Sequence, residues 1–514
     1  MLFDLAIIGF GVIGVETLYG IKQSLIKRKI KKIIKIAVIE KDLNNIPGGV
    51  AYSKQKSKFG YFNNPLRLSH QDFIKWFNKK KNKDLIINFS KNNKNYNLID
   101  WLKRNNHLLN QNFSSYKEIY LPRLIYSFFL KDKIIDFLKF NKKLKIKLKF
   151  YKGDVVNIKK NNFYTILPNK KFTCMDLNLV KNEIKFKKRK LLLVKNLKTE
   201  RIILGTGLVP PKKIKEIINY PNNNYIWDFY TSGGTSNLIK KINLIHKKKK
   251  NVKLVFIGNK AGLLETMQEI ERLIKIKKFS INIISISKNS LTLQKAERSK
   301  KFPLFKYKFF TKKNINQISK AHQISDLLLK EFKQAKKFKF NKYDVWTNIL
   351  KDKIMTHCYN RLTQKEKKLY NQLIFPFIRS KTRYTYPETI SAKNRLLRNK
   401  KIKFLKDKVI LITKNKDNIL LKTITNKLIT SDIVVNVSGP VNIVENKDEI
   451  KLVSALKKIT NKVNQTGFTP NNNFMLENGL YIPGTLANNF NPGRQTIIKA
   501  ITNNTHKITQ NIFK

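Results

Sequence analysis

Apolar and polar residues follow one another along the chain in patterns that predict strands and helices, and the opening segment is the clearest case. An apolar run at residues 5–8 leads into Gly9, Gly11 and Gly14, which complete a G-x-G-x-x-G, and apolar positions at helical spacing follow. This order predicts a strand, a glycine turn and a helix. The glycines allow a tight turn and close backbone approach, and the helix start presents free N–H groups. The pattern therefore predicts a site for the pyrophosphate of a dinucleotide.

The second predicted strand, KIAVIEKD, supports this interpretation because it ends in an acid. Glu40 stands where a carboxylate accepts hydrogen bonds from the ribose of a bound nucleotide. The interval from Gly14 is longer than the usual spacing of about 20 residues, and a lysine-rich helix fills it. The alternative is a glycine-rich turn that binds nothing. The complete order of strand, glycines, helix, strand and acid favours a dinucleotide site.

A second unit of the same kind is predicted at NVKLVFIGNKAGLLETMQEIERLIKI. Its turn carries Gly258 and Gly262, with Lys260 in place of a middle glycine. The following strand, INIISISK, ends at Lys288 rather than at an acid. A lysine there suits the 2′-phosphate of NADP better than the ribose of NAD. The alternative is a dinucleotide fold that has lost its pocket.

The remaining pattern indicates an α/β protein with additions. Residues 142–200 alternate as strands, whereas residues 312–372 are polar with helical spacing and predict an inserted helical segment. Near the end, GLYIPGTLANNFNPGRQTIIKAI predicts a strand, a glycine turn and a helix. We expect a first domain at 1–245, a second at 250–430, and a return segment at 431–514 that completes the first.

Composition changes this picture little. The formal net charge is +73, from 106 Lys and Arg against 33 Asp and Glu, but the lysines are spread along the chain rather than clustered. We interpret them as compositional drift and expect no specific nucleic-acid partner; a polyanion-binding role is the alternative. Cys174 and Cys358 form no metal or redox spacing and fit a reducing cytoplasm, and the six histidines are scattered. No apolar run is long enough for a transmembrane helix, so we expect no membrane association.

Several short motifs together resemble a known family. GGVAYS at residues 48–53 and FNNP at 62–65 match segments that line the flavin in FAD/NAD(P)-binding flavoproteins, and Pro122, Arg123 and Tyr126 match a helix of the same family. RIILGTG carries Gly205, Thr206 and Gly207 where the family has A-T-G. The chain thus resembles two-dinucleotide-binding-domain oxidoreductases, including urate hydroxylase-like and N-hydroxylating monooxygenases.

The resemblance implies two Rossmann-like domains, the FAD domain discontinuous and of the three-layer ββα type, with a helical insertion. It implies FAD and NADPH as cofactors. The cofactor-binding candidates are Gly9, Gly11, Gly14, Glu40, Gly48, Gly49, Asn63, Gly205, Thr206, Gly207, Gly258, Gly262, Lys288, Gly439, Gly484 and Thr485. Gly439 ends the strand SDIVVNVSGP, which the resemblance places beside the flavin.

Two arginines are candidates for a role near the reaction. Arg494 stands near the predicted C-terminal helix start, over the flavin, and Arg123 could meet a cofactor phosphate, a substrate carboxylate or a structural ion-pair partner. A basic stretch with Arg379 and Arg383 also resembles the family. The implied function is an FAD-dependent oxidoreductase that takes hydride from NADPH, with hydroxylation of a small molecule as one outcome. The alternatives are a flavin protein without NADPH turnover and a polyanion-binding protein.

Overall fold

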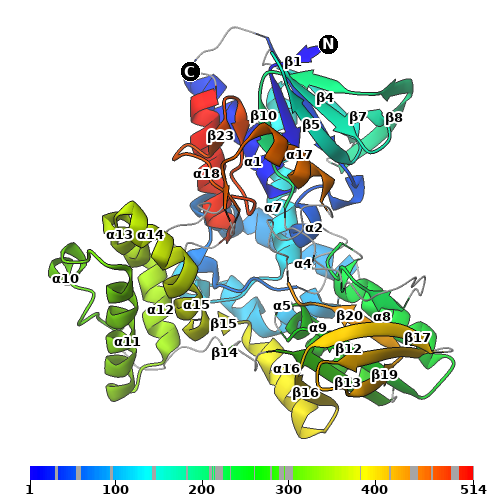
Figure 1. Ribbon diagram of the computed structural model, residues 1–514, viewed down its shortest axis with the longest axis vertical. Coiled ribbons are helices and arrows are strands. Elements are labelled where there is room, and N and C mark those ends of the chain that lie inside the picture. Colours follow the sequence, from blue (N-terminus) through cyan, green and yellow to red (C-terminus); the bar gives the residue numbers. More distant parts are fainter. Residues whose placement is uncertain are drawn as a thin grey trace.

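The computed structural model describes residues 1–28, 33–53, 60–92, 96–141, 146–180, 183–207, 211, 214, 224–231, 233–259, 261–277, 280–288, 294–295, 305–382, 384–415, 418–439, 450–464, 467–487 and 497–512. Figure 1 shows three bodies: a sheet domain at the top, a second sheet domain at the lower right and a helical body at the left. Within the described residues, no helix combines the length and apolar character needed to cross a membrane.

The first domain is built on a mixed eight-stranded sheet whose centre is parallel. Its strands, in spatial order, are β23 (Met475–Glu477), β24 (Leu480–Tyr481), β10 (Ile202–Leu204), β2 (Leu5–Ile8), β3 (Ile34–Glu40), β4 (Ile146–Lys152), β7 (Phe172–Val180) and β8 (Glu183–Val194). The central strands β10, β2, β3 and β4 run parallel, as the strand–turn–helix pattern predicts. The last strands of this sheet along the chain, β23 and β24, therefore join it at β10, which in turn pairs with β2 from the beginning of the chain.

Alternate residues of β2 and β3 face two different layers. Leu5, Ile7, Ile36 and Val38 pack with the helices α1 (Val12–Arg28), α7 (Arg123–Asn141) and α18 (Ile497–Ile512). Ala6, Ile8, Ala37 and Ile39 face a smaller sheet and the helix α17 (Lys451–Ile459). The smaller sheet has the order β1 (Leu2–Phe3), β9 (Leu197–Thr199), β6 (Tyr164–Pro168) and β5 (Val155–Lys160). Because side chains alternate across a strand, an almost continuous apolar run can serve both layers. The predicted three-layer ββα arrangement is confirmed.

A layer of short helices follows β3 and leads to α7. It comprises η1 (Leu43–Asn45), α2 (Gly49–Tyr52), η2 (Leu66–Leu68), α3 (Gln71–Asn78), α4 (Lys80–Asn92), α5 (Tyr96–Leu109) and α6 (Phe113–Tyr116). Fully buried aromatic side chains hold it to α7; Phe73, for example, packs edge-on against Tyr126 with ring centroids 4.9 Å apart. This layer carries the residues of the FNNP motif.

The second domain repeats the same plan. Its sheet is parallel throughout, in the order β11 (Tyr225–Ile226), β20 (Ile433–Asn436), β12 (Asn251–Ile257), β13 (Ser280–Ser287) and β16 (Ile402–Lys406). One face packs with α8 (Gly234–His246), α9 (Ala261–Lys277) and α16 (Pro387–Arg398). The other packs with an antiparallel meander of β17 (Val409–Asn415), β18 (Asn418–Thr423) and β19 (Leu428–Ser431).

The strand pairing bears on the proposed domain limits. β11 and α8 precede residue 250 yet pack in the second domain, and β20, within the expected return segment, pairs with β12. This pairing fits domain limits at which the first section ends before β11 and the return segment begins after β20. It fits limits at 245 and 431 less well. The domain limits remain a proposal.

The inserted body is helical and has its own core. It contains α10 (Lys312–Asn316), α11 (Ala321–Lys337), α12 (Lys342–Lys351), α13 (Ile354–Arg361), α14 (Gln364–Leu369), the π-helical turn η3 (Tyr370–Ile374) and α15 (Phe375–Lys381). The expected helical insertion is confirmed. The short pairs β14 (Gln294–Lys295) with β15 (Tyr384–Thr385), and β21 (Val463–Asn464) with β22 (Gly467–Phe468), complete the described elements. The Tyr343 hydroxyl of α12 is hydrogen-bonded to that of Tyr120, which joins this body to the first domain.

Candidate functional site

The opening glycine turn follows β2 and packs against the end of the neighbouring strand β10. Gly9 has a φ of +94°, and a Cβ there would overlap the Gly205 carbonyl group. The Gly9 N–H donates to the Ile39 carbonyl at 2.8 Å, and the Gly205 N–H donates to the Ile8 carbonyl at 2.7 Å. A Cβ at Gly14 would lie 2.6 Å from the Gly9 carbonyl oxygen. The turn therefore needs glycine at these positions, and α1 begins directly after it, as a pyrophosphate site requires.

The glycine pair of the GGVAYS motif closes on this turn. Gly48 forms an isolated parallel bridge with Gly11, and a Cβ at Gly11 would lie 3.3 Å from the Gly49 Cα. Gly48 and Gly49 both have positive φ, of +105° and +66°. The motif thus does more than reverse the chain: it brings a second glycine backbone against the first. Asn63 lies in an exposed position of the following layer.

Glu40 lies at the end of β3 and contacts the glycine turn. Its Oε2 accepts the Phe10 N–H at 2.7 Å, and its Oε1 accepts the Asp42 N–H at 3.0 Å. Burial raises the pKa of Glu40, against the effect of these backbone donors. Each carboxylate oxygen has a second lone pair, so Glu40 can hold the turn and accept a ribose hydroxyl at the same time. The residues of the turn and Glu40 fit an adenine dinucleotide.

The C-terminal glycine turn lies against the same place. A Cβ at Gly484 would lie 2.6 Å from Cδ1 of Ile13 in α1, and the Thr485 hydroxyl donates to the Gly207 carbonyl at 2.8 Å. Thr206 and Gly207 are exposed at the end of β10. The structure thus brings Gly9, Gly205, Gly207, Gly484 and Thr485 together. Arg494, with residues 491–495 of the predicted helix start, lies outside the described residues.

The second glycine turn is built in the same way. Gly258 has a φ of +109°, and its Cβ would lie 2.7 Å from the Val437 carbonyl oxygen at the end of β20. A Cβ at Gly262 would lie 2.8 Å from Cγ1 of Val437. Lys288 is exposed at the end of β13. Lys260 and Arg383 lie outside the described residues, and nothing is described of the Arg379 side chain.

Gly439 follows β20, which pairs with β12 of the second domain, and it has a φ of +97°. Its place after β20 is the place that Gly207 has after β10. Strand pairing thus assigns β20 to the sheet of the second unit. That Gly439 lies beside the flavin stays a prediction.

Arg123 connects the two units. Its guanidinium forms an ion pair with Glu265 of α9, and its Nε donates to the Tyr61 carbonyl at 2.9 Å. Burial alone would lower the pKa of Arg123, but the Glu265 carboxylate raises it. Of the roles left open by the sequence, the geometry matches the structural ion pair. Glu265 was not singled out from the sequence, since an acid on an amphipathic helix is an ordinary surface residue.

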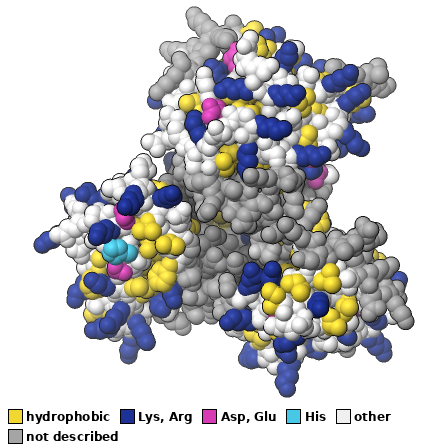
Figure 2. Space-filling view, viewed as in Figure 1, with side chains coloured by type: hydrophobic (Ala, Val, Ile, Leu, Met, Phe, Trp, Pro, Cys, Tyr) yellow, Lys and Arg dark blue, Asp and Glu magenta, His cyan; other side chains and the backbone are white. Residues whose placement is uncertain are grey.

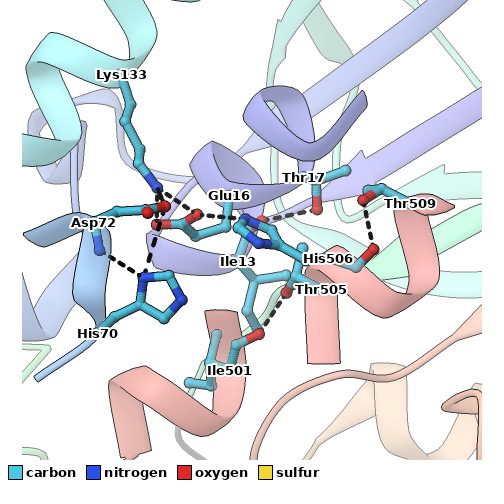
Figure 3. A network of polar contacts seen from close by, with 10 residues as sticks. All are labelled: Ile13, Glu16, Thr17, His70, Asp72, Lys133, Ile501, Thr505, His506 and Thr509. Carbon is cyan, nitrogen blue, oxygen red and sulfur yellow. Dashed lines mark hydrogen bonds and ion pairs between the residues drawn. The ribbon is translucent and has the colours of Figure 1, made fainter. Parts of the chain in front are cut away.

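A second polar network, also missed from the sequence, lies behind α1. Figure 3 shows Lys133 of α7 and His506 of α18 converging on Glu16 of α1. Lys133 Nζ contacts both carboxylate oxygens, at 2.9 and 2.8 Å, and His506 Nε2 lies 3.0 Å from Oε2. Burial would raise the pKa of Glu16, but Lys133 and then His506 lower it to about 2. A signal existed: Glu16 stands within the apolar stretch VIGVETLYG, where a lone acid needs a buried partner.

Known proteins resemble the chain in family model and in fold. Residues 6–171 match the model of the FAD-NAD(P)-binding family. Ornithine hydroxylase from Pseudomonas aeruginosa, in its reduced form, has 11% identity and a TM-score of 0.53, with 100% of this chain and 99% of that chain covered. The ornithine N-hydroxylase of Kutzneria sp. 744 has 8% identity and a TM-score of 0.54, over 100% and 99% of the two chains.

A third solved structure, L-lysine 6-monooxygenase from Pseudomonas syringae, has 9% identity and a TM-score of 0.53, with 99% of each chain covered. No curated protein matches the sequence. At these identities the solved structures establish the fold, which they share over their whole length. Residues 6–171 thus match the FAD-NAD(P)-binding family model, and the chain as a whole shares its two-unit fold with these solved structures.

Proposed function

We propose that this protein is an FAD-dependent oxidoreductase that uses NADPH, and that it is a monooxygenase of a small molecule. The observation that carries the proposal is the pair of glycine turns, each closed against its own return strand at Gly205 and Val437. A chain with two such turns can bind one dinucleotide in each unit. The fold shared with ornithine and lysine hydroxylases over their full length supports the same assignment.

The residues around the first turn would hold FAD. Gly9, Gly11 and Gly49 let the backbone segments of the turn pack closely against one another. The start of α1 would supply N–H groups to the pyrophosphate, and Glu40 would supply the ribose acceptor. FAD, when bound, supplies the redox chemistry. The turn at Gly484 and Thr485 lies against α1 and Gly207, beside the first glycine turn. No protein nucleophile is needed for such a reaction.

The residues around the second turn would hold NADPH. Gly258 and Gly262 provide the close approach, and the exposed Lys288 stands where a 2′-phosphate would extend past the strand end. The alternative, a flavin protein without NADPH turnover, is favoured by Lys260 at the middle position of the turn. The two proposals differ only in whether NADPH reduces the flavin.

The positive charge does not favour a polyanion-binding role. Figure 2 shows that Lys and Arg side chains are spread over all three bodies on the visible face and are not gathered into one basic patch there. A nucleic-acid site would gather them along one groove or helix face. We propose the cytoplasm as the location, because Cys174 and Cys358 are buried free thiols of the kind a reducing compartment preserves.

One experiment tests the proposed function directly. The purified protein is examined for the visible absorption of oxidised flavin and then mixed with NADPH without oxygen. Yellow protein that bleaches with NADPH supports the oxidoreductase, whereas yellow protein that does not bleach supports the alternative. Colourless protein that refuses added FAD contradicts both. Ornithine and lysine, the substrates in the names of the similar structures, are the first compounds for a hydroxylation assay.

A further inference from the structure

Helix α7 pairs with the nucleotide-binding helix of each unit. Near its middle, Lys133 contacts Glu16 of α1 at 2.8 Å, and at its start Arg123 pairs with Glu265 of α9. Both pairs are largely buried: the side chains of Lys133 and Glu16 are 6% and 0% exposed, and those of Arg123 and Glu265 are both 14% exposed. The first pair lies within one domain, whereas the second joins two domains that are otherwise built on separate sheets.

The place of Arg123 is prepared by its own segment. Its Nε donates to the Tyr61 carbonyl, and its N–H donates to the Gly60 carbonyl at 2.8 Å. A Cβ at Gly60 would lie 3.2 Å from Arg123 Cδ and 3.3 Å from Nε. Contacts with Gly60 and Tyr61, next to the FNNP segment, therefore orient the guanidinium independently of Glu265. A rigidly held planar donor fixes the position of its partner more closely than a flexible lysine would.

The ion pair also lies close to both predicted cofactor sites. Glu265 follows the second glycine turn by one helical turn, and the Tyr230 hydroxyl lies 3.5 Å from the position of a Cβ at Gly262. Tyr230 and Tyr52 of the GGVAYS motif both interact electrostatically with the charges of the pair. Burial raises the pKa of each phenol, and the positive charge of Arg123 opposes this rise. The charged pair thus lies between the segment that follows one turn and the helix that follows the other.

We propose that Arg123 is a positioning residue, whose ion pair with Glu265 sets the placement of the second dinucleotide unit on the first. The proposal rests on the proposed function, because its consequence is the approach of NADPH to the flavin. A displacement of about an ångström between reacting groups can lower the reaction rate about 100-fold. Loss of the pair is therefore expected to slow transfer between the cofactors without weakening FAD binding.

The test compares Glu265→Gln with Glu271→Gln on the same helix. Glu271 pairs with Arg395 of α16 at 2.5 Å, inside the second domain, so its substitution removes an ion pair of α9 without touching the contact between domains. Hydrogen exchange of the full chain without cofactor is measured over residues 60–62, 123–130 and 261–270. Flavin reduction is then followed with NADPH and, separately, with dithionite.

The proposal expects Glu265→Gln alone to increase exchange in these segments. It also expects slowing of NADPH-driven reduction by about 10- to 100-fold, with dithionite reduction and FAD affinity within about twofold of the original protein. Equal effects of the two substitutions, or none from Glu265→Gln, would overturn it. Gly60→Ala is the second variant: it displaces Arg123 and keeps both charges, and a smaller slowing is expected.

Failure of the proposed function gives a different result. If the unmodified protein binds no FAD, or NADPH does not reduce it, the oxidoreductase proposal fails. The exchange comparison in cofactor-free protein still decides the role of Arg123, since increased exchange in Glu265→Gln and not in Glu271→Gln supports the positioning contact. Unchanged exchange in both contradicts it.

Discussion

The two dinucleotide-binding units use one framework and differ at the end of the second strand. In both, a glycine with positive φ lies against the carbonyl of a return strand: Gly9 against Gly205, and Gly258 against Val437. In the first unit the acid Glu40 accepts a turn N–H, whereas in the second Ser285 donates to the Gly258 carbonyl at 3.2 Å and Lys288 is exposed. Backbone packing thus determines the turn, and we propose that the residue at the end of the second strand selects the nucleotide.

The first unit is also contacted by a glycine turn from the C-terminal segment. The turn of Gly484 and Thr485 contacts Ile13 and Gly207. Gly207 after β10 and Gly439 after β20 are alike, since neither has another described atom within 4 Å of a Cβ position. Residues 440–449, which follow Gly439, lie outside the described residues.

The largest expected effect comes from exchanging the turn glycines for alanine. Gly9→Ala is expected to abolish FAD binding, because the new Cβ would overlap a backbone carbonyl that the pairing of β2 with β10 holds in place. Gly258→Ala is expected to leave FAD bound and to abolish reduction by NADPH. Flavin content and anaerobic NADPH titration measure the two outcomes, and each variant is the control for the other. Retention of full FAD affinity in Gly9→Ala would contradict the assignment of the first unit.

The buried ion pair of Glu16 in α1 should stabilise the fold more than the partly exposed pair of Glu271 in α9. Because the pKa of Glu16 is lowered to about 2 from 4.5, its ionised form stabilises the fold fully above pH 4.5, and this contribution is lost as the pH falls toward 2. Lys133→Met leaves the Glu16 charge buried and is expected to cost about 3–5 kcal/mol at neutral pH. Denaturant unfolding across this pH range measures both effects. Glu271→Gln, which affects a partly exposed pair, is the control and should cost about 1 kcal/mol or less.

Two substitutions of Glu40 should distinguish its support of the glycine turn from its recognition of the ribose. Glu40→Ala leaves the Phe10 N–H without its acceptor and is expected to weaken FAD binding on the order of 100-fold, whereas Glu40→Gln keeps an acceptor oxygen and should cost about tenfold. Equilibrium titration of cofactor-free protein with FAD gives both values. Equal affinities for the two variants would mean that the carboxylate acts only through its charge.

The smallest effect is expected at Lys288. Lys288→Ala is expected to lower the preference for NADPH over NADH by about fivefold, because an exposed charge interacts with a phosphate through water. The ratio of kcat/KM for the two nucleotides measures this change. Lys403→Ala, at an exposed lysine of the neighbouring strand β16, is the control. A preference unchanged by Lys288→Ala would place recognition of the 2′-phosphate at another residue.

The sequence alone determined the local units: the glycine turns, the strands and helices around them, the helical insertion and the candidate FAD residues at the first turn. These follow from short-range rules, since glycine conformation and apolar periodicity act within a few residues. The resemblance to flavoproteins also implied that the C-terminal segment with Gly484 returns to the first domain, and the structure adds the contact of that turn with α1. The motifs were readable because each is contiguous in the chain.

Only the tertiary structure decided which distant residues meet. Strand pairing places β11 and β20 in the second sheet. The packing of α7 places Arg123 next to Glu265 and Lys133 next to Glu16. No local pattern specifies such partners, because a buried charge requires only some opposite charge, and the chain offers many lysines and arginines. The path of the backbone selects among them, since it fixes which side chains come within a few ångströms of each other.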